Sequence, residues 1–215
     1  MPASQTTPPR RPPLFIIIAV VACGPLAIHI LVPSLPGLQS IFDTNYATVQ
    51  LTLTLYFFAF AGAQLIYGPL SDRFGRRPVL LAGMALYVGG GVICLSASTI
   101  EVLIGGRIVQ GIGGCAGFVL ARAIVRDLYE REKAASMLAY VTMAMVVVPM
   151  MAPGIGGYLD LWFGWWASFF LVVTYGIVVT VAAILVLHET NMTRQPLRGI
   201  TDLTRSYGQL LRLRV

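Results

Sequence analysis

Two ionisable side chains, His29 and Arg107, lie inside long apolar stretches of this 215-residue sequence. Each stands a few residues from one end of its stretch, so the two lie at a similar depth. Ionisable groups inside a membrane are energetically expensive, and those that are present usually serve proton transfer or a substrate path. We therefore consider both residues functional candidates, and His29 a candidate proton site because histidine titrates near neutral pH.

Both residues also have a purely structural explanation. A neutral His29 can hydrogen-bond to the backbone or to a glutamine, and Arg107 can extend along its helix to the nearer membrane surface. Arg122, at the opposite end of the stretch that holds Arg107, is expected to extend to the surface in this way. Like-charge repulsion from Arg107 opposes a protonated His29, and the apolar stretches contain no Asp or Glu to offset it.

The elements that hold these side chains are membrane spans. Hydrophobic residues make up 57% of the chain and charged residues only 11%, whereas about a quarter of a soluble domain is charged. We therefore predict an all-α membrane protein in which six transmembrane helices form one bundle over residues 14–187. The predicted spans are residues 14–32, 49–67, 79–97, 102–125, 134–157 and 165–187.

The distribution of basic residues predicts the orientation of this bundle. Segments 33–48, 98–101 and 158–164 contain no Lys or Arg, and nearly all basic residues fall in the remaining loops and the two tails. Cytoplasmic loops are enriched in Lys and Arg, so we predict that both termini are cytoplasmic. The net charge of +6 is then a sign of membrane topology, and no nucleic-acid partner is expected.

The two ends of the chain are predicted to lie outside the bundle. Residues 1–13 are rich in proline and are expected to form a disordered cytoplasmic tail. Residues 188–215 are polar again and are expected to form a cytoplasmic linker. Within this linker, apolar residues share one face of a short interfacial helix predicted from about residue 201.

The sequence has no pattern that is typical of an enzyme or a metal site. It contains no Cys/His spacing for a metal, no nucleotide loop, and no nucleophile with a suitable base. Cys23, Cys94 and Cys115 all lie in apolar stretches and are predicted to be buried without disulfide bonds. We therefore expect neither enzyme activity nor a bound cofactor or metal.

The segment Gly68–Pro78 joins the second and third predicted spans and is strongly charged. It carries Asp72 and three arginines, so it cannot lie in hydrocarbon, and the arginines predict a cytoplasmic position. We expect a short hinge in which Gly68 and Gly75 allow tight turns. Pro78 suits the first turn of the following helix, where its missing N–H costs nothing.

This segment resembles the signature loop of the major facilitator superfamily, written G-x-L-x-D-R-x-G-R-R, which lies between the second and third helices of that family. The resemblance implies a cytoplasmic gate formed by Gly68, Asp72, Arg73, Gly75, Arg76 and Arg77. Arg107 and Gly111 likewise resemble the R-x-x-x-G motif of the fourth helix. This second resemblance implies that Arg107 faces the central cavity and influences proton transfer.

The fifth span resembles the antiporter signature of the same superfamily, written G-x-x-x-G-P-x-x-G-G. The candidate antiporter-type residues are Pro149, Pro153, Gly156 and Gly157. Val148 and Ala152 replace the two earlier glycines of the signature, and the bulk of valine opposes close packing at that point. The alternative is a kinked helix that serves packing alone.

Further stretches, among them Gln64–Pro69, Arg126–Tyr129 and Met151–Pro153, narrow the resemblance to the Bcr/CflA group of drug-efflux transporters. That group commonly has an acidic residue where this chain has His29. The resemblance implies export of small lipophilic drug-like molecules across a bacterial cytoplasmic (inner) membrane, with the proton gradient as the energy source. The candidate substrate contacts in the second span are Tyr56, Phe57 and Gln64.

Transporters of this family consist of two six-helix halves joined by a cytoplasmic linker, with the substrate site between them. This chain resembles the N-terminal half alone. We therefore expect it to work by alternating access with a second six-helix half, which is either a separate chain or a part lost by truncation. The alternative is a truncated membrane protein that transports nothing and only associates with membrane partners.

Overall fold

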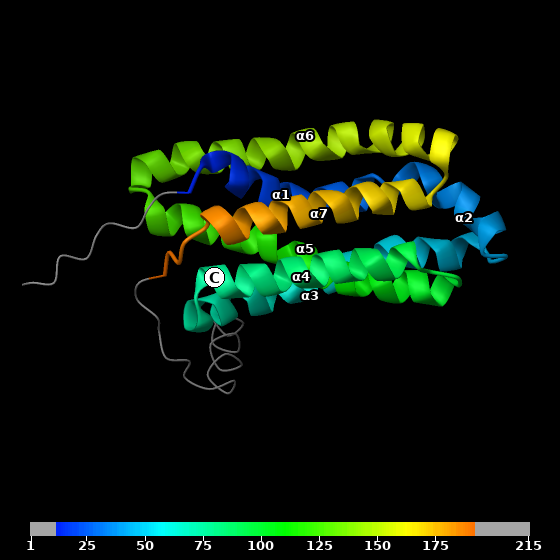
Figure 1. The fold of residues 1–215 in the computed structure, drawn as a ribbon, viewed down its shortest axis with the longest axis horizontal. Helices are drawn as coiled ribbons and strands as arrows, with labels where there is room; N and C mark the ends of the chain where they lie inside the picture. Colours follow the sequence, from blue (N-terminus) through cyan, green and yellow to red (C-terminus); the bar gives the residue numbers. More distant parts are fainter. Residues whose placement is uncertain (1–11, 192–215) are drawn as a thin grey trace, which may run out of the picture.

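The computed structural model describes residues 12–191, and every regular element in this range is helical. In chain order the elements are α1 (Leu14–His29), the short 3₁₀ turn η1 (Val32–Ser34), α2 (Leu35–Ile41), α3 (Tyr46–Phe74), α4 (Arg76–Leu95), α5 (Ile100–Leu128), α6 (Arg131–Phe163) and α7 (Trp166–Val186). The long helices run along the longest dimension of the molecule (Figure 1). Six described segments are long and apolar enough to cross a membrane, with α1, η1 and α2 together forming the first. The predicted all-α class with six spans is confirmed.

The predictions for the two ends of the chain fall mostly beyond this range. Most of the predicted N-terminal tail and the whole predicted interfacial helix lie outside the described residues.

The charged segment predicted to be a hinge is mostly helical. α3 continues through Phe74 and α4 begins at Arg76, so Gly75 alone separates the two helices. Gly75 has a φ of +102°, a conformation that glycine adopts at little steric cost. Residues 70–74 contain neither glycine nor proline, so no residue after Pro69 breaks the helix before Gly75. Pro78 lies in the first turn of α4, as predicted.

The starts of the long helices differ in how they are capped. The side chain of Asn45 accepts a hydrogen bond of 2.9 Å from the N–H of Thr48 at the start of α3, and Thr99 accepts one from Val102 at the start of α5. Such caps satisfy N–H groups that have no partner within the helix. Gly75 supplies no side-chain cap to α4, so the first N–H groups of α4 need an acceptor from elsewhere in the chain.

Helix α5 lies at the centre of the bundle. In its most apolar segment 61% of the residues are buried, a share that only the first span (72%) exceeds among the six candidate spans of the described residues. A Cβ atom added at Gly113 would overlap the backbone of α4, one at Gly111 the backbone of α3, and one at Gly117 the backbone of α1. Small residues allow such close approach between helices in a membrane. Three neighbouring helices therefore pack against α5 through backbone contacts, and this packing fixes the position of the side chains on α5.

The three cysteines, Cys23, Cys94 and Cys115, are buried and form no disulfide bonds. Cys94 lies against α5, where a Cβ atom added at Gly106 would lie 2.7 Å from the Sγ atom of Cys94. The sequence-based prediction of buried thiols is confirmed.

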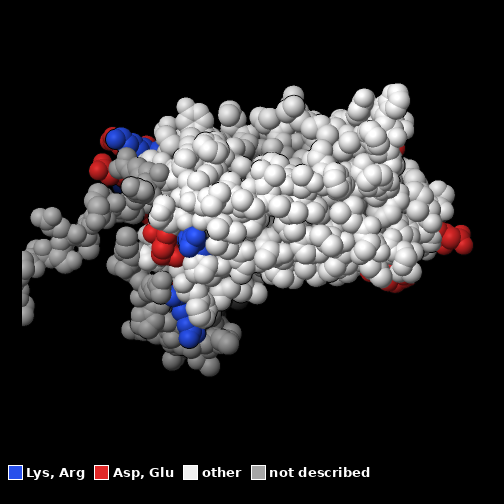
Figure 2. All heavy atoms as spheres, in the orientation of Figure 1, with Lys and Arg blue, Asp and Glu red and all other residues white. Residues whose placement is uncertain are grey.

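Charged side chains gather at the two ends of the bundle. In Figure 2 the visible Lys and Arg side chains lie at the end that holds the α3–α4 and α5–α6 junctions, and the charged side chains visible at the opposite end are acidic. Asp43 and Glu101 belong to that opposite end, as their positions beside α2 and at the start of α5 indicate. We call the arginine-rich end the basic end. The positive-inside bias predicts that this end faces the cytoplasm.

Candidate functional site

Arg107 lies at the centre of a buried polar cluster between α1, α3 and α5. It has no exposed surface (0%). Its Nη1 atom donates to the carbonyl oxygen of Ala27 at 2.9 Å and to Oε1 of Gln110 at 2.6 Å. Its Nε atom donates to the carbonyl oxygen of Thr52 at 3.4 Å, and its guanidinium carbon lies 4.2 Å from the centroid of the Tyr56 ring. Arg107 is therefore held inside the bundle and does not extend to the membrane surface.

No carboxylate balances this buried cation among the described residues, because the ion pairs found there involve Arg76. Carbonyl dipoles, an amide oxygen and the face of an aromatic ring surround the guanidinium group instead. Two donors of the cluster, Nη2 of Arg107 and Nε2 of Gln110, are buried without an acceptor in the described part of the chain. A buried donor without an acceptor is costly, so each of these two groups calls for a structural or functional explanation.

His29, the other candidate for proton coupling, is the last residue of α1 and is partly exposed. Its ring makes no hydrogen bond or ion pair with any residue from 12 to 191. Arg107 contacts the same helix two residues earlier, at the carbonyl group of Ala27. The structure therefore places the two candidates near the same end of α1 without joining their side chains.

The three candidate substrate contacts on α3 do not share one surface. Tyr56 is fully buried, and its hydroxyl group donates to the carbonyl oxygen of Gly24 at 3.2 Å. Phe57 and Gln64 are exposed, and their spacing of seven residues puts them on one face of the helix. A helix turns by about 100° per residue, so Tyr56 points inward toward Arg107 while Phe57 points outward. Substrate contact by Tyr56 stays a prediction, and the structure encloses this side chain within the bundle.

Arg76 is the centre of an ionic network at the basic end. Its Nε atom donates to Oδ2 of Asp127 at 2.9 Å, and its Nη1 atom pairs with Oδ1 of Asp72 at 2.6 Å. Nη1 also donates to the hydroxyl oxygen of Ser71, whose own hydroxyl group donates to the carbonyl oxygen of Gly68. The network joins the end of α3, the start of α4 and the end of α5.

The two other arginines of the predicted gate have separate contacts. Arg77 donates to the carbonyl oxygen of Ile184 on α7 at 2.8 Å. Arg73 is exposed, and its guanidinium carbon lies 4.9 Å from the centroid of the Phe74 ring. Arg76 is therefore the one arginine of this segment that forms ion pairs within the described residues.

A polar cleft of about 410 Å³ opens beside this network, between α3 and α5. Gln64 and Asp72 line it from α3, and Arg122 and Arg126 line it from α5. Arg122 lies over the ring of Phe118 at 4.4 Å and donates to the sulfur atom of Met145 at 3.2 Å. Arg122 was expected to extend to the membrane surface, whereas the structure places it in the wall of this cleft.

Sequence reasoning missed Asp127 and Glu189 as members of the basic-end network. Asp127 lies near the end of α5, and Glu189 follows α7 and contacts the start of α4. The sequence places Asp72, Glu130 and Glu132 at the same end of the bundle. No local pattern therefore distinguishes Asp127 and Glu189 from these other acidic residues, and their contacts depend on how α4 packs against α5 and the end of α7.

On α6, the antiporter-type residues bring the helix close to α1. A Cβ atom added at Gly156 would overlap the carbonyl group of Ile30, and one at Gly157 would lie 3.7 Å from the ring of Pro33. Pro153 and Pro149 both lie within α6, which continues past them to Phe163. Of the glycines here, Gly156 is therefore the point of closest contact between α6 and α1.

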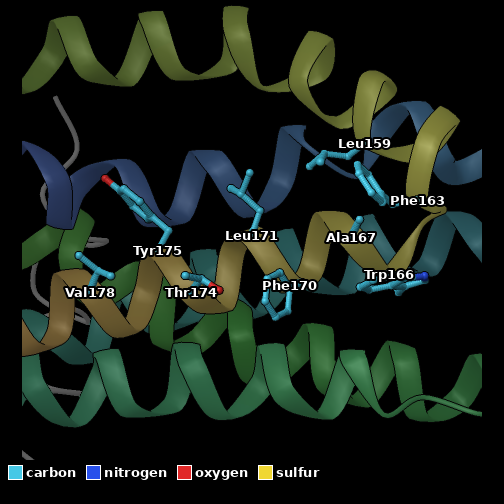
Figure 3. Close-up of a pocket in the computed structure, with 9 residues that line it drawn as sticks. All are labelled: Leu159, Phe163, Trp166, Ala167, Phe170, Leu171, Thr174, Tyr175 and Val178. Atoms are coloured by element: carbon cyan, nitrogen blue, oxygen red, sulfur yellow. The ribbon is translucent and has the colours of Figure 1, made fainter.

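An apolar groove of about 730 Å³ lies between α6 and α7 (Figure 3). Aromatic side chains of Phe163, Trp166, Phe170 and Tyr175 contribute to its walls, and none of its lining residues is charged. A groove of this composition can accommodate hydrocarbon, but it is remote from the Arg107 cluster in sequence and shares none of its residues.

Comparison with known proteins relates the chain to membrane transporters. It is 35% identical over 171 residues to "Multidrug resistance protein D" of Escherichia coli (strain K12), a match that covers 79% of this chain and 43% of that protein. It is 39% identical over 145 residues to "Chloramphenicol resistance protein" of Pseudomonas aeruginosa, covering 67% of this chain and 35% of that protein. The chain therefore spans less than half the length of these curated relatives.

Solved structures support the same fold. The human organic anion transporter MFSD10 (TETRAN) matches 92% of this chain and 53% of its own, with a TM-score of 0.72 at 21% identity. The peptide transporter POT matches with a TM-score of 0.75 at 14% identity, covering 93% of this chain and 44% of its own. At these identities the likeness concerns the fold alone. The family model described as Major Facilitator Superfamily matches residues 15–214, and because this match covers nearly the whole sequence, the chain belongs to the Major Facilitator Superfamily.

Proposed function

We propose that this chain is the six-helix part of a secondary transporter that exports small lipophilic molecules in exchange for protons. The observation that carries the proposal is the buried Arg107 cluster in a chain whose relatives are named for drug resistance. A buried cation is retained in a membrane span at a high energetic cost, which a role in coupling explains. Export would use the proton gradient of a bacterial inner membrane and no bound cofactor.

The transport cycle in this proposal needs a second six-helix bundle. Alternating access is then a rocking of the two bundles around a substrate site between them. Helices α3 and α6 leave exposed surface that a second bundle can contact, because only 28% and 17% of the residues in their most apolar segments are buried. We refer to this chain together with a second bundle as the assembled transporter.

The residues of the chain have distinct roles in the proposal. The exposed Phe57 and Gln64 contact the substrate, and the cleft beside Gln64 is its inner exit. The network around Arg76 closes that exit when the bundles come together, because it ties α3, α4 and α5 into one unit. Arg107 responds to the protonation of a nearby group through its unpartnered Nη2 donor, next to the unpartnered Nε2 donor of Gln110.

Residues 1–215 expressed alone in a pump-deficient bacterial host are expected to export nothing, because one bundle cannot enclose a site that lies between two. Accumulation of chloramphenicol and of a fluorescent lipophilic dye measures this. Co-expression of the remaining part of the Escherichia coli relative is the matched test, and it should restore uncoupler-sensitive efflux. Robust efflux by the chain alone would contradict the need for a second bundle, and no efflux in either case would favour a membrane protein that only associates with partners.

His29 is expected to carry the exchanged proton. Export by the assembled transporter should then vary with pH through the titration of an imidazole group rather than a carboxylate. His29→Asp should keep proton coupling and move the pH profile, whereas His29→Gln should lose proton-driven efflux and keep passive exchange. Transport in membrane vesicles at several pH values measures both. Full proton-coupled export by His29→Gln would leave His29 as a packing residue.

A further inference from the structure

The first N–H groups of α4 find their acceptor in a residue that follows α7. The backbone N–H of Arg76 donates to Oε1 of Glu189 at 2.8 Å, across 113 residues of sequence. The N–H of Arg77 donates to Oε2 of the same carboxylate at 3.3 Å. Carboxylates at a helix N-terminus are stabilised by free N–H groups and by the helix dipole. Glu189 thus provides the cap that Gly75 lacks.

The same carboxylate also organises the chain that follows it. The N–H groups of Thr190 and Asn191 donate to Oε1 of Glu189 at 3.1 and 3.0 Å. The side-chain amide of Asn191 donates to the carbonyl oxygen of Asp72 at 3.0 Å and to that of Ser71 at 3.4 Å. Both carbonyl groups belong to the last turn of α3, where helical donors run out; that of Ser71 also accepts from the N–H of Gly75. The segment Glu189–Asn191 therefore caps the end of α3 as well as the start of α4.

The geometry at Gly75 fits this contact. A Cβ atom added there would overlap the Glu189 carboxylate, and the φ of +102° disfavours any other residue independently. The carboxylate can approach both N–H groups only because position 75 has no side chain. Gly75 thus serves the carboxylate contact as well as the turn between the helices.

We propose that Glu189 is a positioning residue for the basic-end network. By holding the first turn of α4, it fixes the backbone of Arg76 at the point from which the guanidinium group reaches Asp72 and Asp127. The chain that leaves the sixth span is thereby coupled to the junction between the second and third spans. A displacement of this exit segment would release the cap and loosen the ion pairs of Arg76.

Hydrogen–deuterium exchange on the purified full chain in detergent tests the cap. The variants are Glu189→Gln, which keeps one acceptor oxygen without the charge, Glu189→Ala, which removes the whole group, and the control Glu132→Gln. Glu132 is an exposed acidic residue at the same end of the bundle that forms no ion pair within the described residues. Exchange of the Arg76 and Arg77 amides should rise by about tenfold or more in Glu189→Ala and by less in Glu189→Gln. Glu132→Gln should leave it unchanged.

A double-variant comparison identifies the contact itself. Gly75→Ala should also accelerate exchange, because its Cβ atom displaces the carboxylate. If Glu189 acts at this position, adding Glu189→Ala to Gly75→Ala should increase exchange little further, since the cap is already lost. Fully additive effects, or wild-type exchange in Glu189→Ala, would overturn the inference.

A transport measurement tests the positioning role, and this part rests on the proposed function. In the assembled transporter, Glu189→Gln should lower kcat and leave KM nearly unchanged, because Glu189 contacts the gate and not the substrate cleft. Loss of the cap in the exchange experiment with unchanged kcat would show that Glu189 only stabilises α4 and would refute the coupling. Absence of transport in the wild type would instead count against the proposed function, while the exchange data decide the cap.

Discussion

Arg107→Met is expected to abolish export by the assembled transporter and to leave the stability of the bundle unchanged or higher. The side chain is fully buried without a carboxylate partner among the described residues. Burying a single charge costs roughly several kcal/mol of desolvation, and this substitution removes that cost without leaving a partner charge unpaired. Function and stability should therefore change independently. Drug efflux in cells and thermal unfolding of the purified chain measure the two effects.

Arg107→Lys is the informative companion to this substitution. Lysine keeps the charge but cannot donate to the carbonyl groups of Ala27 and Thr52 and lie flat over the Tyr56 ring at the same time. We expect export to fall by about tenfold or more, equivalent to about 1.4 kcal/mol, with correct membrane insertion. Wild-type export by Arg107→Met would refute a coupling role for the cluster, whereas wild-type export by Arg107→Lys would show that the charge alone is sufficient.

Gly156→Ala is expected to destabilise the contact between α1 and α6, and Gly154→Ala on the same helix is its matched control. A Cβ atom at Gly156 overlaps the carbonyl group of Ile30, whereas one at Gly154 meets nothing within 4 Å. Overpacking of this kind typically costs about 1–3 kcal/mol, and replacing an exposed helical glycine with alanine stabilises by about 0.5–1 kcal/mol. The two substitutions should therefore shift the unfolding temperature of the purified chain in opposite directions. Equal shifts in unfolding temperature would mean that α6 can move away from α1 without a loss of stability.

Hydrophobicity and charge were sufficient to predict the class and the number of spans, because both depend on composition over long windows. The exact ends of the helices were harder to predict from the sequence. α3 extends to Phe74, well past the predicted apolar run, since a helix with internal backbone bonds need not stop at the membrane surface. The sequence therefore predicts a hinge around Asp72, whereas this segment is helical.

The site was only partly predictable for a different reason. The sequence marks Arg107 as unusual, but its contacts with Ala27 and Tyr56 depend on how α1, α3 and α5 pack together. Adjacent residues such as Tyr56 and Phe57 point to different sides of α3, and no apolar periodicity separates them clearly in a helix that is apolar on most faces. The cap provided by Glu189 joins positions too distant in sequence for any local pattern to reveal.

The burial of all three native thiols makes this chain a convenient subject for site-directed labelling. Cys23, Cys94 and Cys115 lie in the interior of the helix packing, so water-soluble maleimides should leave them largely unmodified. A single cysteine introduced at Phe57 or Gln64 would then report its own accessibility from each side of the membrane, without prior removal of native residues. Such a scan would determine experimentally which end of the bundle faces the cytoplasm and when the cleft beside α3 is open to water.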